Sequence, residues 1–306
     1  MKRIYDMLVI GGGPGGYTAA LYAARAGLSV AVLEKLSAGG QMALTDTVDN
    51  YPGFPEGIDG FALGENMQLQ AERFGAETVL TEVLELDLIP EEKVVRTSDG
   101  IFWGRTVVFS TGASPRQLGL PNEDFFTGRG LHYCAACDGM RYKGKVVAVI
   151  GGGDSAVAEA LSLARIAEKV IIIHRRDSLR ATKVYHKTLE DAPNIEFYWN
   201  STVTELLGQG RLSALRLQNV LTGEESELRV DGVFVSIGRQ PATALVKGQL
   251  NLDDKGYIVA GEDTVTSLPG VFAVGDVRTK TLRQIVTAVS DGAVAAHFAQ
   301  EFALGK

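Results

Sequence analysis

The sequence is poor in cysteine, and it has no long apolar run. Its only two cysteines, Cys134 and Cys137, stand at C-x-x-C spacing, which favours a working redox pair over a structural staple. No apolar stretch approaches the roughly 20 residues that a membrane-spanning helix needs, and no segment is of low complexity. We therefore expect a globular protein of the cytoplasm with no membrane partner.

The chain also lacks the positive charge of a nucleic-acid-binding protein. Its formal charge is −7, and its pI is near 5.3, so no nucleic-acid partner is expected. The N-terminal residues 1–10 superficially resemble a short signal peptide, but Asp6 interrupts the apolar run, and a glycine loop follows instead of a cleavage site. A first β-strand is the better interpretation.

Glycine is abundant instead, with 36 residues, and the first glycine loop predicts a dinucleotide site. The loop is expected between a strand over 5–10 and a helix over 17–26, and a second strand over 29–33 ends at Glu34. A carboxylate there can accept hydrogen bonds from a ribose and would repel a 2′-phosphate, so the site suits FAD or NAD. A glycine-rich turn without function is the alternative. The loop residues are Gly11, Gly13, Pro14, Gly15 and Gly16.

The same pattern returns 140 positions later, with strands over 145–150 and 169–173 around a helix over 155–166. Its loop fits G-x-G-x-x-A, and basic residues replace the acid at the end of the second strand. Guanidinium groups pair bidentately with phosphate, which favours NADPH over a merely solvated basic face. The loop residues are Gly151, Gly153, Asp154, Ser155 and Ala156, and the basic group is His174, Arg175, Arg176 and Arg180.

The order of these motifs predicts an inserted domain. Apolar strands over 107–113 and 233–238 are followed by prolines that mark crossings between domains, and a strand over 270–276 and a helix over 287–302 complete the chain. We expect an α/β protein of two Rossmann-like, three-layer domains. The predicted bounds are 1–115 and 242–306 for a discontinuous FAD domain and 116–241 for an inserted NADPH domain that carries the C-x-x-C.

The cysteine pair has three possible roles. Half of a zinc site would need further ligands, and His132 alone supplies one, so no metal is expected. Inert buried thiols are the second possibility. A redox disulfide is the interpretation that we prefer, because this spacing closes a small ring and can poise one thiolate, and Asp138 can act as acid or base beside it.

The segment 264–276 resembles the second FAD fingerprint of flavoprotein reductases, in which the aspartate, here Asp276, binds the ribityl hydroxyls. Together with Thr111 and Gly112, this segment favours FAD in the first site.

Taken together, the motifs resemble the low-molecular-weight thioredoxin reductases of bacteria, plants and fungi, nearly from end to end. The resemblance implies an NADPH-dependent, homodimeric thioredoxin-disulfide reductase. It implies that Cys137 faces the flavin, that Cys134 attacks thioredoxin, and that the two domains alternate between two orientations. The residues expected to contact FAD outside the glycine loop are Glu34, Lys35, Gly39, Gly40, Gln41, Asn50, Asp276, Arg283, Gln284 and Ile285.

Other functions remain open. The chain could reduce a different thioredoxin-like protein or a low-molecular-weight disulfide. A flavoprotein partner of a peroxiredoxin would carry an extra N-terminal region of about two hundred residues, and a ferredoxin-NADP reductase of the same fold would lack the cysteine pair. A redox sensor without enzymatic activity is the remaining alternative.

Overall fold

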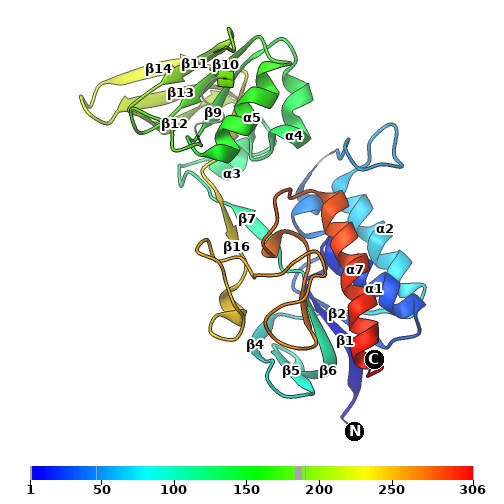
Figure 1. Cartoon of the computed structure of the whole chain (residues 1–306). Coiled ribbons are helices and arrows are strands. Elements are labelled where there is room, and N and C mark those ends of the chain that lie inside the picture. Colours follow the sequence, from blue (N-terminus) through cyan, green and yellow to red (C-terminus); the bar gives the residue numbers. More distant parts are fainter. Residues whose placement is uncertain (1, 46, 183–187, 190, 306) are drawn as a thin grey trace. The chain divides into compact units, whose positions relative to one another are not determined.

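The computed structural model describes residues 2–45, 47–182, 188–189 and 191–305, and it divides the chain into two compact units. Unit 1 comprises Met1–Ser114 and Gln240–Lys306, and unit 2 comprises Pro115–Arg239. Each unit has its own sheet and its own helices (Figure 1).

Unit 1 is built on a seven-stranded sheet with the order β3-β2-β1-β6-β5-β4, to which β17 adds beside β6. The pairs of β1 with β2 and β6, of β2 with β3 and of β6 with β17 are parallel, whereas β4, β5 and β6 pair antiparallel. The strands are β1 (Ile4–Ile10), β2 (Val30–Glu34), β3 (Glu77–Leu80), β4 (Val83–Asp87), β5 (Lys93–Thr97), β6 (Gly100–Phe109) and β17 (Val271–Ala273).

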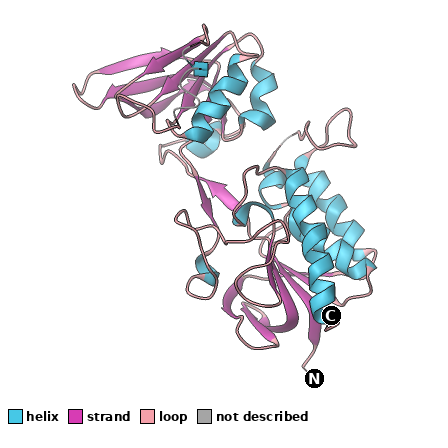
Figure 2. Cartoon of the chain, in the orientation of Figure 1, coloured by secondary structure: helices cyan, strands magenta, loops and turns pink. Residues whose placement is uncertain are grey.

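Three helices of unit 1 lie side by side next to this sheet (Figures 1 and 2). They are α1 (Pro14–Arg25), α2 (Gly60–Glu72) and α7 (Ile285–Ala303), and short 3₁₀ turns are η1 (Gly40–Leu44), η3 (Ala244–Val246) and η4 (Gly275–Val277). Helix α1 begins at Pro14, before the predicted start, because proline is preorganised for the first helical position. Helices α1 and α7 approach closely: a Cβ added at Gly292 would lie 2.3 Å from the Gly15 carbonyl oxygen.

Unit 2 repeats the nucleotide-binding architecture on a parallel five-stranded sheet with the order β11-β10-β9-β15-β8. Its strands are β8 (Leu131–His132), β9 (Val146–Ile150), β10 (Lys169–Ile173), β11 (Ile195–Tyr198) and β15 (Gly232–Val235). An antiparallel sheet of β12 (Ser201–Gln209), β13 (Arg211–Asn219) and β14 (Glu225–Arg229) accompanies it. The helices are α3 (Glu123–Phe126), α4 (Ala135–Asp138) and α5 (Asp154–Ala164), with a 3₁₀ turn η2 (Gly139–Tyr142).

The central strands are apolar on both faces, as parallel strands between two layers must be. In β9 and β10 every residue but the first is buried. Apolar clusters fill both sides of each large sheet, so each unit has the three layers of a Rossmann-like fold. The predicted fold class is thereby confirmed.

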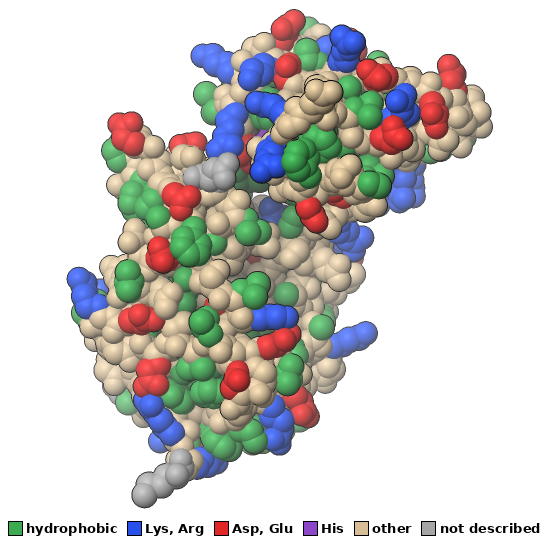
Figure 3. Space-filling model, turned by 180° about the vertical axis from the view of Figure 1, so that it is seen from behind, with side chains coloured by type: hydrophobic (Ala, Val, Ile, Leu, Met, Phe, Trp, Pro, Cys, Tyr) green, Lys and Arg blue, Asp and Glu red, His purple; other side chains and the backbone are tan. Residues whose placement is uncertain are grey.

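The chain crosses between the units twice, and the two crossing segments, β7 (Ala113–Pro115) and β16 (Arg239–Pro241), pair with each other as a two-stranded ribbon. No helix in the described part of the chain is long and apolar enough to span a membrane. On the face shown in Figure 3, acidic and basic side chains are interspersed.

Candidate active site

The first glycine loop joins β1 to α1, and its glycines have different functions. A Cβ at Gly11, where φ is +97°, would lie 2.6 Å from the Ser110 carbonyl oxygen, and a Cβ at Gly16 would lie 2.1 Å from the Gly11 oxygen. The fold itself therefore requires these two glycines. A Cβ at Gly13 would meet no protein atom closer than 3.8 Å. The loop is thus open at Gly13, where a phosphate could approach the N-terminus of α1.

Glu34, at the end of β2, is hydrogen-bonded to this loop. Its Oε2 atom accepts a hydrogen bond from the Gly12 N–H at 2.6 Å, and Oε1 accepts one from the Leu36 N–H at 2.9 Å. Each carboxylate oxygen has a second lone pair. The side chain can therefore hold the loop and still accept hydrogen bonds from a ribose diol.

The segment after β2 returns to the same loop. The Gly39 N–H donates to the Gly12 carbonyl oxygen at 2.8 Å, and a Cβ at Gly40 would lie 3.7 Å from the Cα of Gly13. The exposed Lys35 forms an ion pair with Glu82 at 2.6 Å. Gln41 is exposed. The structure therefore brings Gly39 and Gly40 to the glycine loop, whereas Lys35 is held by a surface carboxylate.

The C-terminal part of unit 1 contributes a second group of predicted residues. The Asn50 side-chain amide donates to Gln284 Oε1 at 3.0 Å, and Gln284 caps the N-terminus of α7, where Ile285 is the first residue. The Arg283 guanidinium donates to the Asp276 carbonyl oxygen at 3.3 Å. These five positions therefore gather at the start of α7.

Thr111 and Gly112 follow the C-terminal end of β6. The Thr111 hydroxyl donates to the Ala242 carbonyl oxygen at 2.9 Å. Gly112 has a φ of +71°, and its carbonyl oxygen accepts a hydrogen bond from the Ala242 N–H at 3.0 Å. Both residues thus tie the end of β6 to the segment that follows β16.

The Gly275–Asp276 turn is fixed by a buried ion network that the sequence analysis missed. Asp291, on α7, accepts from the Gly275 N–H at 2.8 Å, from two nitrogens of Arg278 at 2.9 and 2.7 Å, and from Lys280 at 2.7 Å. Burial raises the pKa of the Asp291 carboxyl, but the hydrogen bonds from Arg278 and Lys280 outweigh it and lower the pKa below its ordinary value. The carboxylate therefore stays ionised and holds the turn.

The second glycine loop, in unit 2, resembles the first in its geometry. A Cβ at Gly151 would lie 2.3 Å from the Ser236 carbonyl oxygen and 2.8 Å from the Cβ of Ala156, whereas a Cβ at Gly153 would meet nothing within 4 Å. Asp154 begins α5, and its Oδ1 accepts from the backbone and the hydroxyl of Thr182 at 2.8 and 3.0 Å. Ser155 is exposed beside it. This loop is open at Gly153 as the first is at Gly13.

The predicted basic residues lie around this loop. The Arg180 N–H donates to the Gly152 carbonyl oxygen at 2.7 Å, and the His174 ring lies so close that a Cβ at Gly152 would be 2.4 Å from it. Arg175 and Arg176 follow β10 directly and are exposed. The structure therefore brings the His174 ring and the Arg180 backbone to the second glycine loop, and Arg175 and Arg176 lie on the segment between them.

His174 is buried, and within the described part of the chain its Nε2 atom has no hydrogen-bond partner. Burial lowers the pKa of His174, and the positive charges of Arg180, Arg176 and Arg175 lower it further. The imidazole is therefore neutral near pH 7, and the local charge is that of the arginines. Such an arrangement favours an anion.

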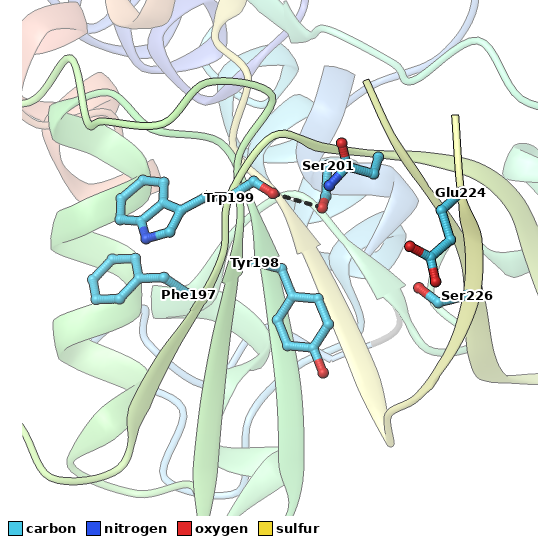
Figure 4. A pocket seen from close by; sticks show the side chains of 7 residues that line it. Phe197, Tyr198, Trp199, Ser201, Glu224 and Ser226 are labelled. Atoms are coloured by element: carbon cyan, nitrogen blue, oxygen red, sulfur yellow. Dashed lines mark hydrogen bonds between the residues drawn. The ribbon is translucent and has the colours of Figure 1, made fainter. Parts of the chain in front are cut away.

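An open pocket of about 310 Å³ lies nearby in unit 2 (Figure 4). The Phe197 and Trp199 rings stack at 4.7 Å on one side of it, and Trp199 also contacts the His174 ring edge to face at 6.4 Å. The other lining residues are Tyr198, Ser201, Asn219, Glu224 and Ser226. The pocket contains none of the predicted site residues, but Trp199 connects it to the basic cluster.

The two cysteines form a disulfide at the N-terminus of the short helix α4, with their Cα atoms 5.4 Å apart. Asp138 ends α4, and its N–H donates to the Cys134 carbonyl oxygen at 3.1 Å. Helix α4 packs against α5, which begins at the second glycine loop. The disulfide, its neighbouring acid and the second nucleotide loop thus belong to one unit. In the described part of the chain, no three His, Cys, Asp or Glu side chains lie close enough to hold a metal ion.

Sequence reasoning also missed the neighbours of Asp138. His132 was considered only as a lone metal ligand, yet its Nδ1 lies 3.2 Å from Asp138 Oδ2. The indication in the sequence was the position of His132, two residues before Cys134. Its partners other than Asp138 come from distant segments, and these contacts cannot be recognised from the sequence.

Comparisons with known proteins identify the family of the chain over nearly its whole length. A family model described as pyridine nucleotide-disulphide oxidoreductase matches residues 5–292. A thioredoxin reductase from Streptomyces coelicolor is 48% identical over 305 residues, which cover 99% of this chain and 95% of that protein. One from Peptoclostridium acidaminophilum is 42% identical over 308 residues, covering 99% and 98%.

The same relationship holds in three dimensions. The crystal structure of thioredoxin reductase from Streptococcus pyogenes superposes with a TM-score of 0.93 at 41% identity and covers all of both chains. The predicted family resemblance and the predicted oxidoreductase class are confirmed. The chain therefore belongs to the pyridine nucleotide-disulphide oxidoreductase family, and its similarity to thioredoxin reductases runs over its whole length.

Proposed function

We propose that the chain is an NADPH-dependent thioredoxin-disulfide reductase in which unit 1 binds FAD and unit 2 binds NADPH. The observation that carries the proposal is the disulfide of Cys134 and Cys137 on a helix packed against α5, beside a basic nucleotide loop. The functional domains would have bounds near 1–115, 116–241 and 242–306.

The residues of both loops fit dinucleotides. The openings at Gly13 and Gly153 leave room for a pyrophosphate against the N-termini of α1 and α5. Glu34 suits a ribose, and the arginines around His174 suit a 2′-phosphate. When bound, FAD supplies the two-electron relay between the nicotinamide and the disulfide.

The remaining chemistry belongs to the chain's own residues. Two electrons and two protons convert the Cys134–Cys137 disulfide into a dithiol, and the Cys134 thiol then releases its proton to the solvent. The Cys134 thiolate then attacks the partner's disulfide, so that a mixed disulfide forms and one partner thiolate leaves. Asp138 takes the proton from the Cys137 thiol and gives it to the leaving sulfur. The Cys137 thiolate attacks Cys134, restores the internal disulfide and releases the second partner thiolate, which takes up the remaining proton.

The partner in this proposal is thioredoxin, and the named relatives support it because they are thioredoxin reductases. We further propose that the protein acts as a homodimer in the cytoplasm, where a C-x-x-C pair can cycle between its two states. The alternative is a different thioredoxin-like or low-molecular-weight disulfide as the electron acceptor.

The test is NADPH and NADH oxidation by the flavin-loaded protein, with thioredoxin or a chromogenic disulfide as acceptor, beside Cys137→Ser. Turnover that needs thioredoxin, prefers NADPH and disappears in the variant would support the proposal. Flavin reduction by NADPH without any thioredoxin reduction would overturn the assigned partner, and activity on the chromogenic disulfide alone would favour the alternative.

A further inference from the structure

The strand that leads into the cysteine pair ends in a buried histidine. His132 is 4% exposed and is the last residue of β8, two positions before Cys134. Its Nδ1 lies 3.2 Å from Asp138 Oδ2, and its Nε2 lies 2.7 Å from the Tyr142 hydroxyl. Arg211 Nη2 lies 3.2 Å from the same hydroxyl. Hydrogen bonds thus join Arg211, Tyr142 and His132, and His132 in turn lies at ion-pair distance from Asp138.

The direction of these hydrogen bonds follows from what each group can do. A guanidinium can only donate, so the Tyr142 oxygen accepts from Arg211. Burial raises the pKa of the Tyr142 hydroxyl, with partial compensation by Arg211, so the hydroxyl keeps its hydrogen and can donate it to His132 Nε2. An imidazole whose Nε2 accepts this hydrogen carries its own hydrogen on Nδ1, the nitrogen that lies 3.2 Å from Asp138 Oδ2.

Packing holds the imidazole in this orientation. The ring stacks on Phe234 at 5.4 Å and meets the Tyr142 ring edge to face at 5.4 Å. Tyr142 is itself confined, because a Cβ at Gly232 would lie 2.2 Å from its ring. Rotation of the imidazole away from Asp138 would therefore require movement of the core of unit 2.

The two oxygens of Asp138 differ as a result. Oδ2 faces His132, whereas Oδ1 faces Arg141 at 3.6 Å, and the Arg141 side chain is 37% exposed. The charged or titratable groups around the carboxylate are thus His132, Arg141, Tyr142 and the cysteine pair.

We propose that His132 is a positioning residue for the dithiol–disulfide reaction, which holds the Asp138 carboxylate in place through its contact with Oδ2, while Tyr142 and Arg211 fix the tautomer of His132. This inference rests on the role proposed above for Asp138. It adds a requirement for three side chains that do not contact the reacting sulfurs in the proposed mechanism.

The test compares His132→Ala, His132→Asn and Tyr142→Phe with the unaltered protein, and His297→Ala, an exposed histidine on α7, is the matched control. The pH profile of kcat/KM for thioredoxin is measured with NADPH saturating. Because Nδ1 contacts the carboxylate that handles the proton, the pH profile of His132→Ala should differ in shape from that of the unaltered protein.

The amide nitrogen of Asn can occupy the place of Nδ1, so His132→Asn should restore most of the profile. Tyr142→Phe should produce a smaller change of the profile, and His297→Ala none. A uniform loss of turnover in all His132 variants with an unchanged profile would overturn the inference. Circular dichroism and the flavin absorption of each variant establish that it is folded.

A second measurement separates this inference from the proposed function. The alkylation rate of the dithiothreitol-reduced cysteines by iodoacetamide is followed against pH in the same variants. If the unaltered protein reduces no thioredoxin, the proposed function fails, and this profile still decides on His132. A change of the alkylation profile in His132→Ala that is reversed in His132→Asn supports the contact between His132 and Asp138, whereas identical profiles in all variants overturn it.

Discussion

Glu34 and Gly12 are joined by a hydrogen bond of 2.6 Å from the Gly12 backbone amide to the carboxylate, which fixes the first glycine loop to the end of β2. The residue that would recognise the ribose is thus also the one that shapes the phosphate loop. Loss of the carboxylate should therefore affect both parts of the site.

We expect Glu34→Ala to weaken FAD binding by about 10- to 100-fold, since hydrogen bonds to a charged group contribute about 1.5–3 kcal/mol. Glu34→Gln keeps one acceptor oxygen and should lose less. The measurement is the flavin-to-protein absorbance ratio after dialysis. Glu85→Gln, an exposed acid that pairs with Arg96, is the control, and full retention of FAD in Glu34→Ala would contradict the assignment.

The basic cluster predicts cofactor preference. Arg176→Ala should lower kcat/KM for NADPH by about tenfold or more, because one charge-assisted contact with the 2′-phosphate is lost. The value for NADH should hardly change. Arg165→Ala, an exposed arginine that follows α5 at its other end, is the control. Equal losses with both dinucleotides would mean that Arg176 does not recognise the 2′-phosphate.

The fluorescence of Trp199 should respond to changes at the same basic cluster, because its ring contacts His174. In a Trp103→Phe background it is the only tryptophan, since the chain has two. A bound 2′-phosphate opposes the arginine charges that lower the pKa of His174, so 2′,5′-ADP should move the pH midpoint of Trp199 emission upward. ADP, which lacks the 2′-phosphate, should leave the midpoint in place. The same midpoint with both ligands would argue against a phosphate at this position.

The parts of the fold that could be predicted from sequence are those with local patterns. The apolar run before each glycine loop and the acid or basic residues after the second strand occur within one β-α-β unit. Their spacing alone therefore predicts a dinucleotide-binding loop. The strands over 145–150 and 169–173 were accordingly found to within one residue.

The contacts that escaped prediction join distant segments. Tyr142 meets Arg211 across 69 positions, and Asp291 meets the Gly275 turn from the next helix. Such pairs depend on how strands and helices are stacked, which no local periodicity records. The available indications were the position of His132, two residues before Cys134, and the carboxylate of Asp291 within the largely apolar helix α7.

Glu159, on α5, predicts a pH dependence of stability. Burial raises its pKa to about 7, although Arg239 and Ser236 partly oppose the shift. The folded state therefore binds a proton that the unfolded state releases above about pH 4.5, and stability falls as the pH rises through 7. Glu159→Gln should raise the Tm by several degrees at pH 8 and change it little at pH 5. The exposed Glu168→Gln is the control, and equal effects at both pH values would contradict this account.

Asp291 predicts the opposite dependence. Because its pKa is lowered in the folded state, its network contributes stability that is fully present above the ordinary carboxyl pKa of about 4 and is lost as the pH falls through the folded value. Asp291→Asn leaves the buried Arg278 and Lys280 without a counter-charge, at a cost of about 3–5 kcal/mol near pH 7.

The expected result is a large decrease in Tm for Asp291→Asn at pH 7, which shrinks as the pH falls below the ordinary carboxyl pKa of about 4, where the advantage of the ionised carboxylate is progressively lost. The Gly275–Asp276 turn should loosen at the same time, so FAD should be retained less well. Glu301→Gln, an exposed acid on the same helix, should show neither effect. A Tm difference that stays constant from pH 7 to pH 3 would mean that Asp291 stabilises the turn by its shape and not by its charge.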